Sequence, residues 1–274
     1  MCYDNSQNRA KERFIIITRK SNLMTETPPA IETHGLSKEY GSTVAVDDLN
    51  LSIDAGTVYG FLGPNGAGKT TTMRMLTGLV EPTTGEATVA GTAVENRREL
   101  IDAVGLLPEE PPLYLELTGR EQLQFAADLA NQDWNEVADR ALELCERLDL
   151  AADLDREVDG YSKGMRQKTA FVQAVQTDPD VLFLDEPTSG LDPRAAKTLR
   201  ELIVDISADT TIFLSTHILP VVEEIADQVG VLYDGQLVAD GEPTELISRV
   251  DDSGSETDLE DAFLDLTSRE AAWA

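Results

Sequence analysis

The spacing of apolar residues changes along the chain, and each spacing predicts a different kind of element. Two short runs that are apolar at nearly every position, 58–62 and 181–184, are typical of strands buried on both faces of a parallel sheet. Strand and helix patterns alternate from 181 to 234, as parallel strands joined by helices require. Strand-like runs at 44–53 and 87–94 predict an antiparallel subdomain beside the first buried strand. The pattern as a whole predicts an α/β fold.

A helix-rich block without a clear strand pattern spans about 119–157. Inside it, the stretch 134–150 repeats apolar residues at helical spacing, which places on one face Val137, Ala141, Leu144, Cys145 and Leu148. Cys145 is therefore predicted to be a core residue with no catalytic role. Further along, Asp234-Gly235 lies between two apolar runs and predicts a hairpin turn.

A glycine-rich loop follows the first buried run and fits the pattern G-x-x-x-x-G-K-[ST] at every fixed position. Backbone N–H groups of such a loop, together with the N-terminus of the next helix, point at phosphate oxygens. Lys69 is expected to reach the β- and γ-phosphates, and the Thr70 hydroxyl to ligate Mg²⁺. A chance glycine-rich turn is the alternative. The predicted ATP-binding residues are Gly63, Pro64, Asn65, Gly66, Ala67, Gly68, Lys69, Thr70 and Thr71.

Two acids, Asp185 and Glu186, end the second buried run. Carboxylates at the carboxyl ends of parallel strands stand where open α/β sheets bind ligands. Asp185 is predicted to hold Mg²⁺ through water, and Glu186 to orient and deprotonate the attacking water. Two solvated acids are an equally good interpretation of the pair alone. After a phosphate loop, the catalytic interpretation is favoured.

A third motif, YSKGM from Tyr161 to Met165, opens a helical pattern that begins at Lys163. Ser162 is a good N-cap, and a capped helix N-terminus presents a hydroxyl and free N–H groups to an anion. The motif resembles the signature of the ATP-binding cassette (ABC) superfamily, whose commonest form is LSGGQ. Ser162 and Gly164 are kept, and Lys163 replaces the first glycine. The resemblance implies that residues Ser162, Lys163, Gly164 and Met165 act on the γ-phosphate held by the opposite subunit; a plain helix cap is the alternative.

The YSKGM form resembles the branch of cassette ATPases that drive exporters of drugs, lipids, polysaccharides and ions. The resemblance implies that Tyr40 stacks on adenine and that His217 contacts the γ-phosphate as a catalytic residue. It also implies that Asp192, in the sequence SGLD, belongs to a loop that communicates across the dimer. Glu109 stands where the family usually has Gln, and its carboxylate can ligate Mg²⁺ or hydrogen-bond water. For Tyr40 and His217, an ordinary surface or structural residue is the alternative.

The resemblance covers roughly residues 30–245 and implies a P-loop NTPase core. Its expected parts are a mostly parallel sheet, an antiparallel β subdomain and an inserted α-helical subdomain at about 112–165. Residues 1–29 are expected to form a disordered extension, although a basic partner-binding arm or a true start at Met24 are alternatives. Residues 246–274 are expected to form an acidic linker and then either a short amphipathic helix or a frayed, solvated tail. The helix is indicated by apolar residues at helical spacing, namely Leu259, Phe263 and Leu266.

The net negative charge of the chain makes some classes of binding partner unfavourable. The chain has 51 acidic and 22 basic residues, a net charge of −29. Such a field disfavours binding to nucleic acid and direct adhesion to anionic lipid. Of the basic residues 15 are arginine and 7 lysine. Acid excess with few lysines resembles proteins of salt-accumulating organisms, so we expect a halophilic protein, with a merely acidic mesophilic protein as the alternative.

These features together predict the ATP-binding and hydrolysing subunit of an ABC exporter. We expect a homodimer or heterodimer of such subunits, cytoplasmic and peripheral on the inner face of the membrane through a separately encoded permease. No run approaches the roughly 18 apolar residues that span a bilayer, and two cysteines give no disulfide framework. The alternatives are a soluble cassette protein of translation or DNA maintenance, a regulatory ATP sensor and an unrelated P-loop GTPase.

Overall fold

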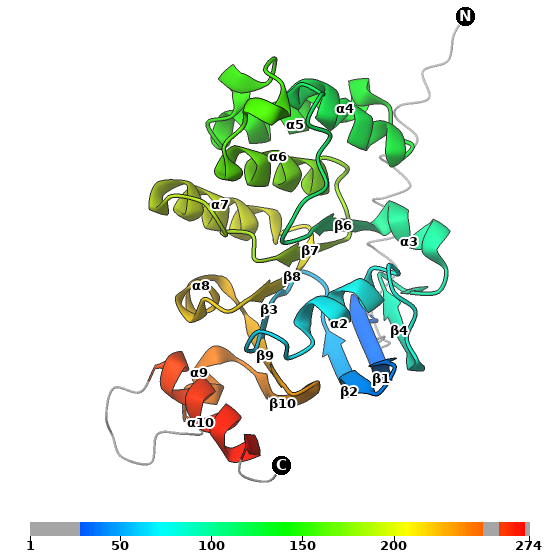
Figure 1. The fold of residues 1–274 in the computed structure, drawn as a ribbon, viewed down its shortest axis with the longest axis vertical. Coiled ribbons are helices and arrows are strands. Elements are labelled where there is room, and N and C mark those ends of the chain that lie inside the picture. The colour runs from blue at the N-terminus through cyan, green and yellow to red at the C-terminus, as the bar shows by residue number, and fades with distance from the viewer. Residues whose placement is uncertain (1–27, 249–257, 272–274) are drawn as a thin grey trace, which may run out of the picture.

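A six-stranded, mostly parallel sheet runs through the middle of the molecule (Figure 1). The computed structural model describes residues 28–248 and 258–271, so 1–27 of the expected extension and the acidic linker lie outside the described residues. Neighbouring strands are parallel except at one edge, where the last strand of the chain pairs antiparallel with its neighbour. The strand order is β10 (Gln236–Gly241), β9 (Gln228–Tyr233), β3 (Val58–Leu62), β8 (Thr211–Thr216), β7 (Val181–Asp185) and β6 (Val104–Leu107).

The expected antiparallel subdomain is a four-stranded sheet whose order is β2 (Thr43–Ile53), β1 (Ile31–Tyr40), β4 (Thr84–Val89) and β5 (Thr92–Ala93). The continuous strand predicted at 87–94 is wrong, because Ala90 and Gly91 adopt positive φ angles of 51° and 74° and turn the chain between β4 and β5. Strand β1 has no clear strand pattern in the sequence. Its register with β2 shifts three times, which breaks the alternation of apolar and polar residues.

Helices α4 (Gly119–Leu129), α5 (Trp134–Arg147) and α6 (Lys163–Val175) gather at one end of the molecule, beyond β6 (Figure 1). The five residues predicted on one face of α5 are all buried. The helix stops at Arg147, before the predicted end at 150, because Asp149 adopts a left-handed conformation with φ of 53°. The predicted boundary of the helical subdomain, about residue 165, falls inside α6.

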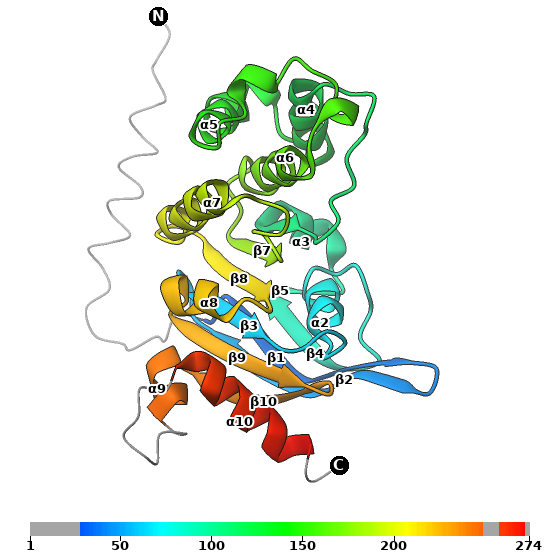
Figure 2. The ribbon, with the colours of Figure 1, turned by 60° about the vertical axis from the view of Figure 1, so that its left-hand side comes forward.

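The central sheet is covered on both faces, with α7 (Pro193–Ile206) and α8 (Leu219–Ile225) on the other side from α2 (Lys69–Leu76) (Figure 2). This cover explains its continuous apolar runs. Alternate side chains face the antiparallel sheet and α2, and their aromatic members are Tyr59, Phe61, Phe183 and Phe213. The intervening side chains pack against α6, α7 and α8. The short helix α3 (Arg97–Ala103) precedes β6.

The C-terminal helix expected from apolar spacing is α10 (Leu259–Ala271). It lies with α9 (Pro243–Ser248) against β9 and β10, at the end of the molecule away from α4 (Figure 1). Leu259 is fully buried there, and Phe263 and Leu266 pack against the same cluster. Across the described residues, each helix is either too short or too polar to cross a membrane.

Candidate nucleotide site

The glycine-rich loop connects β3 to α2, in the strand–loop–helix setting that a phosphate loop requires. Two of its glycines cannot be replaced without a clash. A Cβ atom at Gly63 would lie 2.4 Å from the carbonyl oxygen of Leu232, and one at Gly68 would lie 2.3 Å from that of Ala45. Gly68 also has a φ of 110°, which side-chain-bearing residues rarely adopt. The loop therefore depends on glycine for its close packing and its backbone shape.

Lys69 folds back over this loop. Its ammonium donates hydrogen bonds to the carbonyl oxygens of Gly63 at 2.6 Å and Pro64 at 3.2 Å. Burial lowers the pKa of Lys69, and the nearby carboxylates of Glu186, Asp185 and Glu109 oppose that shift. The ammonium is thus held at the loop by weak neutral acceptors, which phosphate oxygens can replace.

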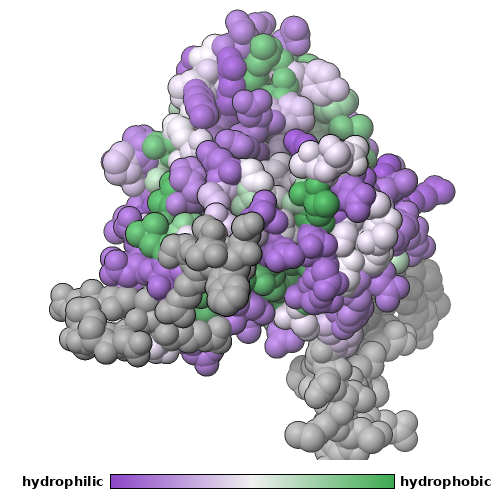
Figure 3. All heavy atoms as spheres, turned by 60° about the horizontal axis from the view of Figure 1, so that its bottom comes forward, coloured by the Kyte–Doolittle hydropathy of each residue, from purple (hydrophilic) through white to green (hydrophobic). Residues whose placement is uncertain are grey.

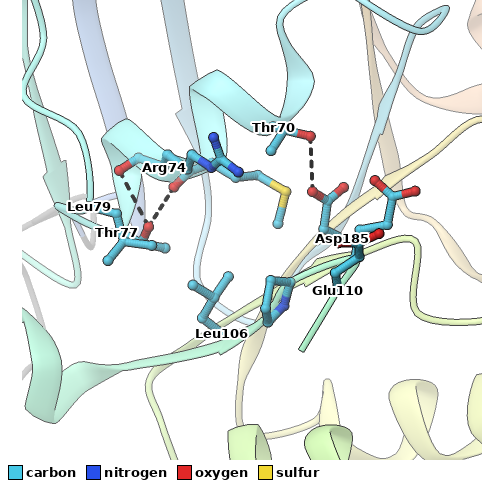
Figure 4. A pocket seen from close by; sticks show the side chains of 10 residues that line it. Thr70, Arg74, Thr77, Leu79, Leu106, Glu110 and Asp185 are labelled. Atoms are coloured by element: carbon cyan, nitrogen blue, oxygen red, sulfur yellow. Dashed lines mark hydrogen bonds between the residues drawn. The ribbon is translucent and has the colours of Figure 1, made fainter. Parts of the chain in front are cut away.

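Asp185 and Thr70 face one another across the site (Figure 4). The Thr70 hydroxyl donates a hydrogen bond of 3.0 Å to Asp185 Oδ2. Burial raises the pKa of Asp185, and the hydrogen bond from Thr70 acts in the opposite direction. Among the described residues, no group of three or more His, Cys, Asp or Glu side chains could hold a metal ion. Thr70 and Asp185 place a hydroxyl and a carboxylate oxygen side by side, and these are donor types that Mg²⁺ accepts alongside phosphate oxygens.

Glu186 is held by three hydrogen bonds from the end of β8. Its Oε2 accepts from the Thr216 hydroxyl at 2.9 Å, and its Oε1 accepts from the His217 backbone N–H at 2.9 Å. The Nδ1 atom of His217 lies 2.6 Å from the same Oε1. The backbone of Glu186 is left-handed, with φ of 48°, and its N–H donates to the Ser215 carbonyl. Among the residues whose burial the structure describes, Asp185 and Glu186 are the only buried acids.

A pocket of about 370 Å³ joins these groups. It is lined by Ala45, Asn65, Gly66, Gly68, Lys69, Thr70, Thr71, Glu109, Asp185, Glu186 and His217. Two residues of the site are not predicted from the sequence. Ala45 lines the pocket from β2, whose position depends on pairing with strands far away in the sequence. Thr216 supports Glu186 but looks like any other residue of a buried strand in the sequence. Tyr40 does not line the pocket and is 47% exposed, so its predicted stacking on adenine stays a prediction.

Glu109 lines both this pocket and a neighbouring one of about 290 Å³. The two pockets share Thr70, Glu109 and Asp185. The rest of the second pocket is formed by α2, the end of β6 and the loops after them, with Met73, Arg74, Thr77, Leu79, Leu106, Pro108 and Glu110. Glu109 is thus near the predicted metal ligands, where its carboxylate could serve the ion or a water.

The signature residues lie outside both pockets. Ser162 is the N-cap of α6, as predicted, and accepts a hydrogen bond of 3.2 Å from the backbone N–H of Met165. Asp192 caps α7 by accepting from the N–H groups of Arg194 and Ala195, both at 3.0 Å. Within one subunit, therefore, neither Ser162 nor Asp192 reaches the phosphate loop.

Residues 46–189, just over half of the chain, match the family model described as ABC transporter. The chain belongs to the ABC transporter family. This membership confirms the resemblance to the ATP-binding cassette superfamily. The parallel sheet with its covering helices confirms the expected α/β fold. The match extends from β2 to the loop after Glu186, so it contains the phosphate loop, the signature and the buried acids.

Relatives and a solved structure agree with this assignment. The bacitracin transport ATP-binding protein BcrA of Bacillus licheniformis is 40% identical over 76% of this chain and 68% of its own length. The daunorubicin/doxorubicin resistance ATP-binding protein DrrA of Streptomyces peucetius is 38% identical over 88% of this chain and 73% of its own. A solved ATP-binding subunit of an ABC transporter, 31% identical, covers 87% of this chain and 99% of that one with a TM-score of 0.81. This cassette is accordingly an ATP-hydrolysing subunit.

Proposed function

We propose that this cassette powers export through a separate membrane permease by hydrolysing Mg²⁺-bound ATP. The observation that carries the proposal is the buried acid pair, Asp185 and Glu186, opposite the phosphate loop. Export is supported by the names of relatives, which include bacitracin transport, daunorubicin resistance and fluoroquinolone export proteins. The cassette would then lie on the inner face of the membrane through its permease.

In this proposal Lys69 and the backbone of residues 63–71 bind the phosphates. Thr70 and Asp185 ligate Mg²⁺, with Glu109 as a further ligand or water holder. Glu186 orients and deprotonates the attacking water, and His217 positions Glu186 and contacts the γ-phosphate. Most of the acceleration would come from positioning and charge stabilisation, since phosphoryl transfer asks little covalent chemistry of the protein.

The complete site is proposed to form only in a head-to-tail dimer. The signature segment, Ser162, Lys163, Gly164 and Met165, lines no part of the pocket, so a phosphate contact from this helix end requires a second subunit. A homodimer would hold two equivalent sites, because this one chain carries every motif. A heterodimer with a related cassette is the second arrangement that the sequence allows.

A substitution at Glu186 tests hydrolysis and assembly together. Glu186→Gln should retain ATP binding and reduce turnover by about 10² or more, because it removes the proposed base. ATP should then trap a dimer, measured by light scattering after size-exclusion chromatography in Mg²⁺. Glu143→Gln, at an exposed position on α5, is the matched control. A Glu186→Gln protein that stays monomeric with ATP and turns over normally would contradict the proposal.

The membrane partner can be identified directly. A tagged copy recovered from detergent-solubilised native membranes in high salt should bring one polytopic membrane protein in about equal amount. Recovery of ribosomes or DNA-repair proteins instead would favour the soluble alternative while leaving the ATP site unaffected.

We also propose that the protein is adapted to high salt. Every described acid except the buried pair is at least partly exposed, and hydrophilic residues dominate the face shown in Figure 3. At a net charge of −29, self-repulsion is strong in dilute buffer and is screened in molar salt, where the Debye length is about 3 Å. The melting temperature should therefore rise from 0.1 to about 3 M KCl. Stability that peaks at low salt would refute this adaptation.

A further inference from the structure

The first turns of the signature helix rest on the segment that leads from Glu186 to α7. Residues i and i+4 of a helix are neighbours on its surface, and here Lys163 and Gln167 both contact that segment, with Gly164 close to it. The helix end that is proposed to meet the partner's ATP is therefore also in contact with its own subunit's catalytic region.

Lys163 makes the outermost of these contacts. Its ammonium lies 3.3 Å from the Ser189 hydroxyl oxygen. Its methylene chain covers Gly190 so closely that a Cβ atom there would lie 2.7 Å from Cδ, 2.9 Å from Cε and 3.0 Å from Cγ of the lysine. Gly190 has a φ of 75°, so it suits glycine on conformational grounds as well. The lysine side chain thus fills the space above this turn.

The other two residues anchor the same segment nearer to Glu186. The buried side-chain amide of Gln167 donates to the carbonyl oxygens of Pro187 at 3.4 Å and Glu186 at 3.5 Å. Gly164 allows close approach, since a Cβ atom there would lie 3.3 Å from the Gly190 carbonyl oxygen. Contacts from one helix side thus hold both ends of the segment 186–190.

We propose that Lys163 is a positioning residue that acts within its own subunit, by clamping the Ser189-Gly190 turn to the signature helix. A displacement of this helix when it meets the partner's ATP is then passed to the turn and to Glu186 of the same subunit. Glycine, the residue at this position in the commonest signature, has no side chain to form such a clamp. The effect on hydrolysis rests on the proposed function; the clamp itself does not.

Removing the clamp should change turnover more than binding. Lys163→Ala should lower kcat about three- to tenfold, the effect of losing one ordinary hydrogen bond at an exposed site, with KM for ATP nearly unchanged. The Hill coefficient for ATP should move toward 1, because coupling between the two sites weakens. Lys163→Arg should restore both values. Lys197→Ala, which removes a lysine from a 3.8 Å surface ion pair on α7, should leave both unchanged.

Mixed dimers separate this role from a contact with the partner's phosphate. In each mixed dimer one subunit carries Glu186→Gln, so both sites should hold ATP while only the other subunit hydrolyses it. Lys163→Ala placed in the hydrolysing subunit should lower turnover, whereas Lys163→Ala placed in the Glu186→Gln subunit should not. The reverse result, or equal losses in the two mixed dimers, would overturn the proposal in favour of a direct contact between Lys163 and the partner's phosphate. No loss of turnover in either mixed dimer would show that Lys163 has no role in hydrolysis.

A measurement on the isolated, nucleotide-free subunit keeps the clamp testable if the proposed function fails. Lys163→Ala should accelerate hydrogen–deuterium exchange of the amides between residues 187 and 191, and Lys163→Arg should not. Unchanged exchange in Lys163→Ala would refute the clamp. Accelerated exchange in a protein that neither dimerises with ATP nor hydrolyses it would support the clamp and refute the proposed function.

Discussion

Thr216 is predicted to hold the catalytic carboxylate, and its replacement by valine tests that role. The Thr216 hydroxyl donates to Glu186 Oε2 at 2.9 Å and accepts from the Ile218 backbone N–H at 3.1 Å, in a residue that is 1% exposed. Valine keeps the shape of threonine but leaves both partners without this hydroxyl. A buried hydrogen bond to a charged group contributes about 1.5–3 kcal/mol. We therefore expect Thr216→Val to lower the free energy of unfolding by about 2–3 kcal/mol.

The same change should reduce turnover. With one of its three hydrogen bonds removed, the Glu186 carboxylate is free to leave the position from which it would take the water proton. We expect kcat to fall about tenfold, the effect of about 1.4 kcal/mol. Urea unfolding followed by circular dichroism gives the stability, and steady-state phosphate release gives kcat.

Thr211→Val is the matched control for these two effects. Thr211 lies at the other end of β8, is 2% exposed, and its hydroxyl accepts from the Gly56 N–H at 3.0 Å. Its replacement should lower the free energy of unfolding by about 1 kcal/mol, because the lost bond is to a neutral group, and leave kcat unchanged. If both variants lose turnover equally, the loss reflects general destabilisation and the positioning role of Thr216 is refuted. A Thr216→Val protein with stability within about 0.5 kcal/mol of the parent would refute the energetic argument.

Three further predictions concern the loop, the buried acid and the cysteine. Gly68→Ala should be less stable than Gly66→Ala in urea unfolding, because Cβ would clash at 2.3 Å at Gly68 but meets nothing within 4 Å at Gly66; equal losses would contradict this. Burial raises the pKa of Asp185 above its ordinary 3.8, so the folded state binds the proton more tightly and its stability falls as the pH rises through that raised value. Asp185→Asn should accordingly be more stable than the parent at pH 7, and the gain should vanish at about pH 3, where the parent is protonated in both states; a gain independent of pH would refute it. Burial raises the pKa of Cys145 to about 11, so in a Cys2→Ser variant the thiol should resist iodoacetamide at pH 8 until denaturant is added; rapid native labelling would contradict this burial.

The sequence was sufficient for features that depend on neighbours along the chain. The phosphate loop, the Ser162 cap, the Asp234-Gly235 turn and the buried acids each follow from a local pattern with one physical cause. In the structure Asp234 and Gly235 have positive φ angles of 47° and 81°, as a tight hairpin turn of this composition requires.

What the sequence could not predict is set by contacts between distant segments. β1 is a strand because β2 and β4 pair with it on both sides, and the bulges in those pairings hide its alternation. Ala45 reaches the nucleotide pocket because β2 packs against the phosphate loop, where the Ala45 carbonyl oxygen lies next to Gly68. The support of Glu186 by Thr216 likewise depends on the pairing of Asp185 with Ser215 in adjacent parallel strands.

The hairpin turn shows how such distant contacts complete the nucleotide site. The Gly235 N–H donates to the carbonyl oxygen of Ala67 in the phosphate loop at 3.0 Å, and the Gly235 carbonyl accepts from the Asp47 N–H at 2.9 Å. One turn therefore bridges the loop and β2, the strand that brings Ala45 to the pocket. This bond fixes the Ala67 carbonyl to the turn, while the Ala67 N–H donates to the Pro64 carbonyl within the loop at 3.1 Å. The same turn begins β10, against which α10 packs. The phosphate loop is thus held in place by the turn between β9 and β10, the last two strands in the chain, as well as by its own glycines.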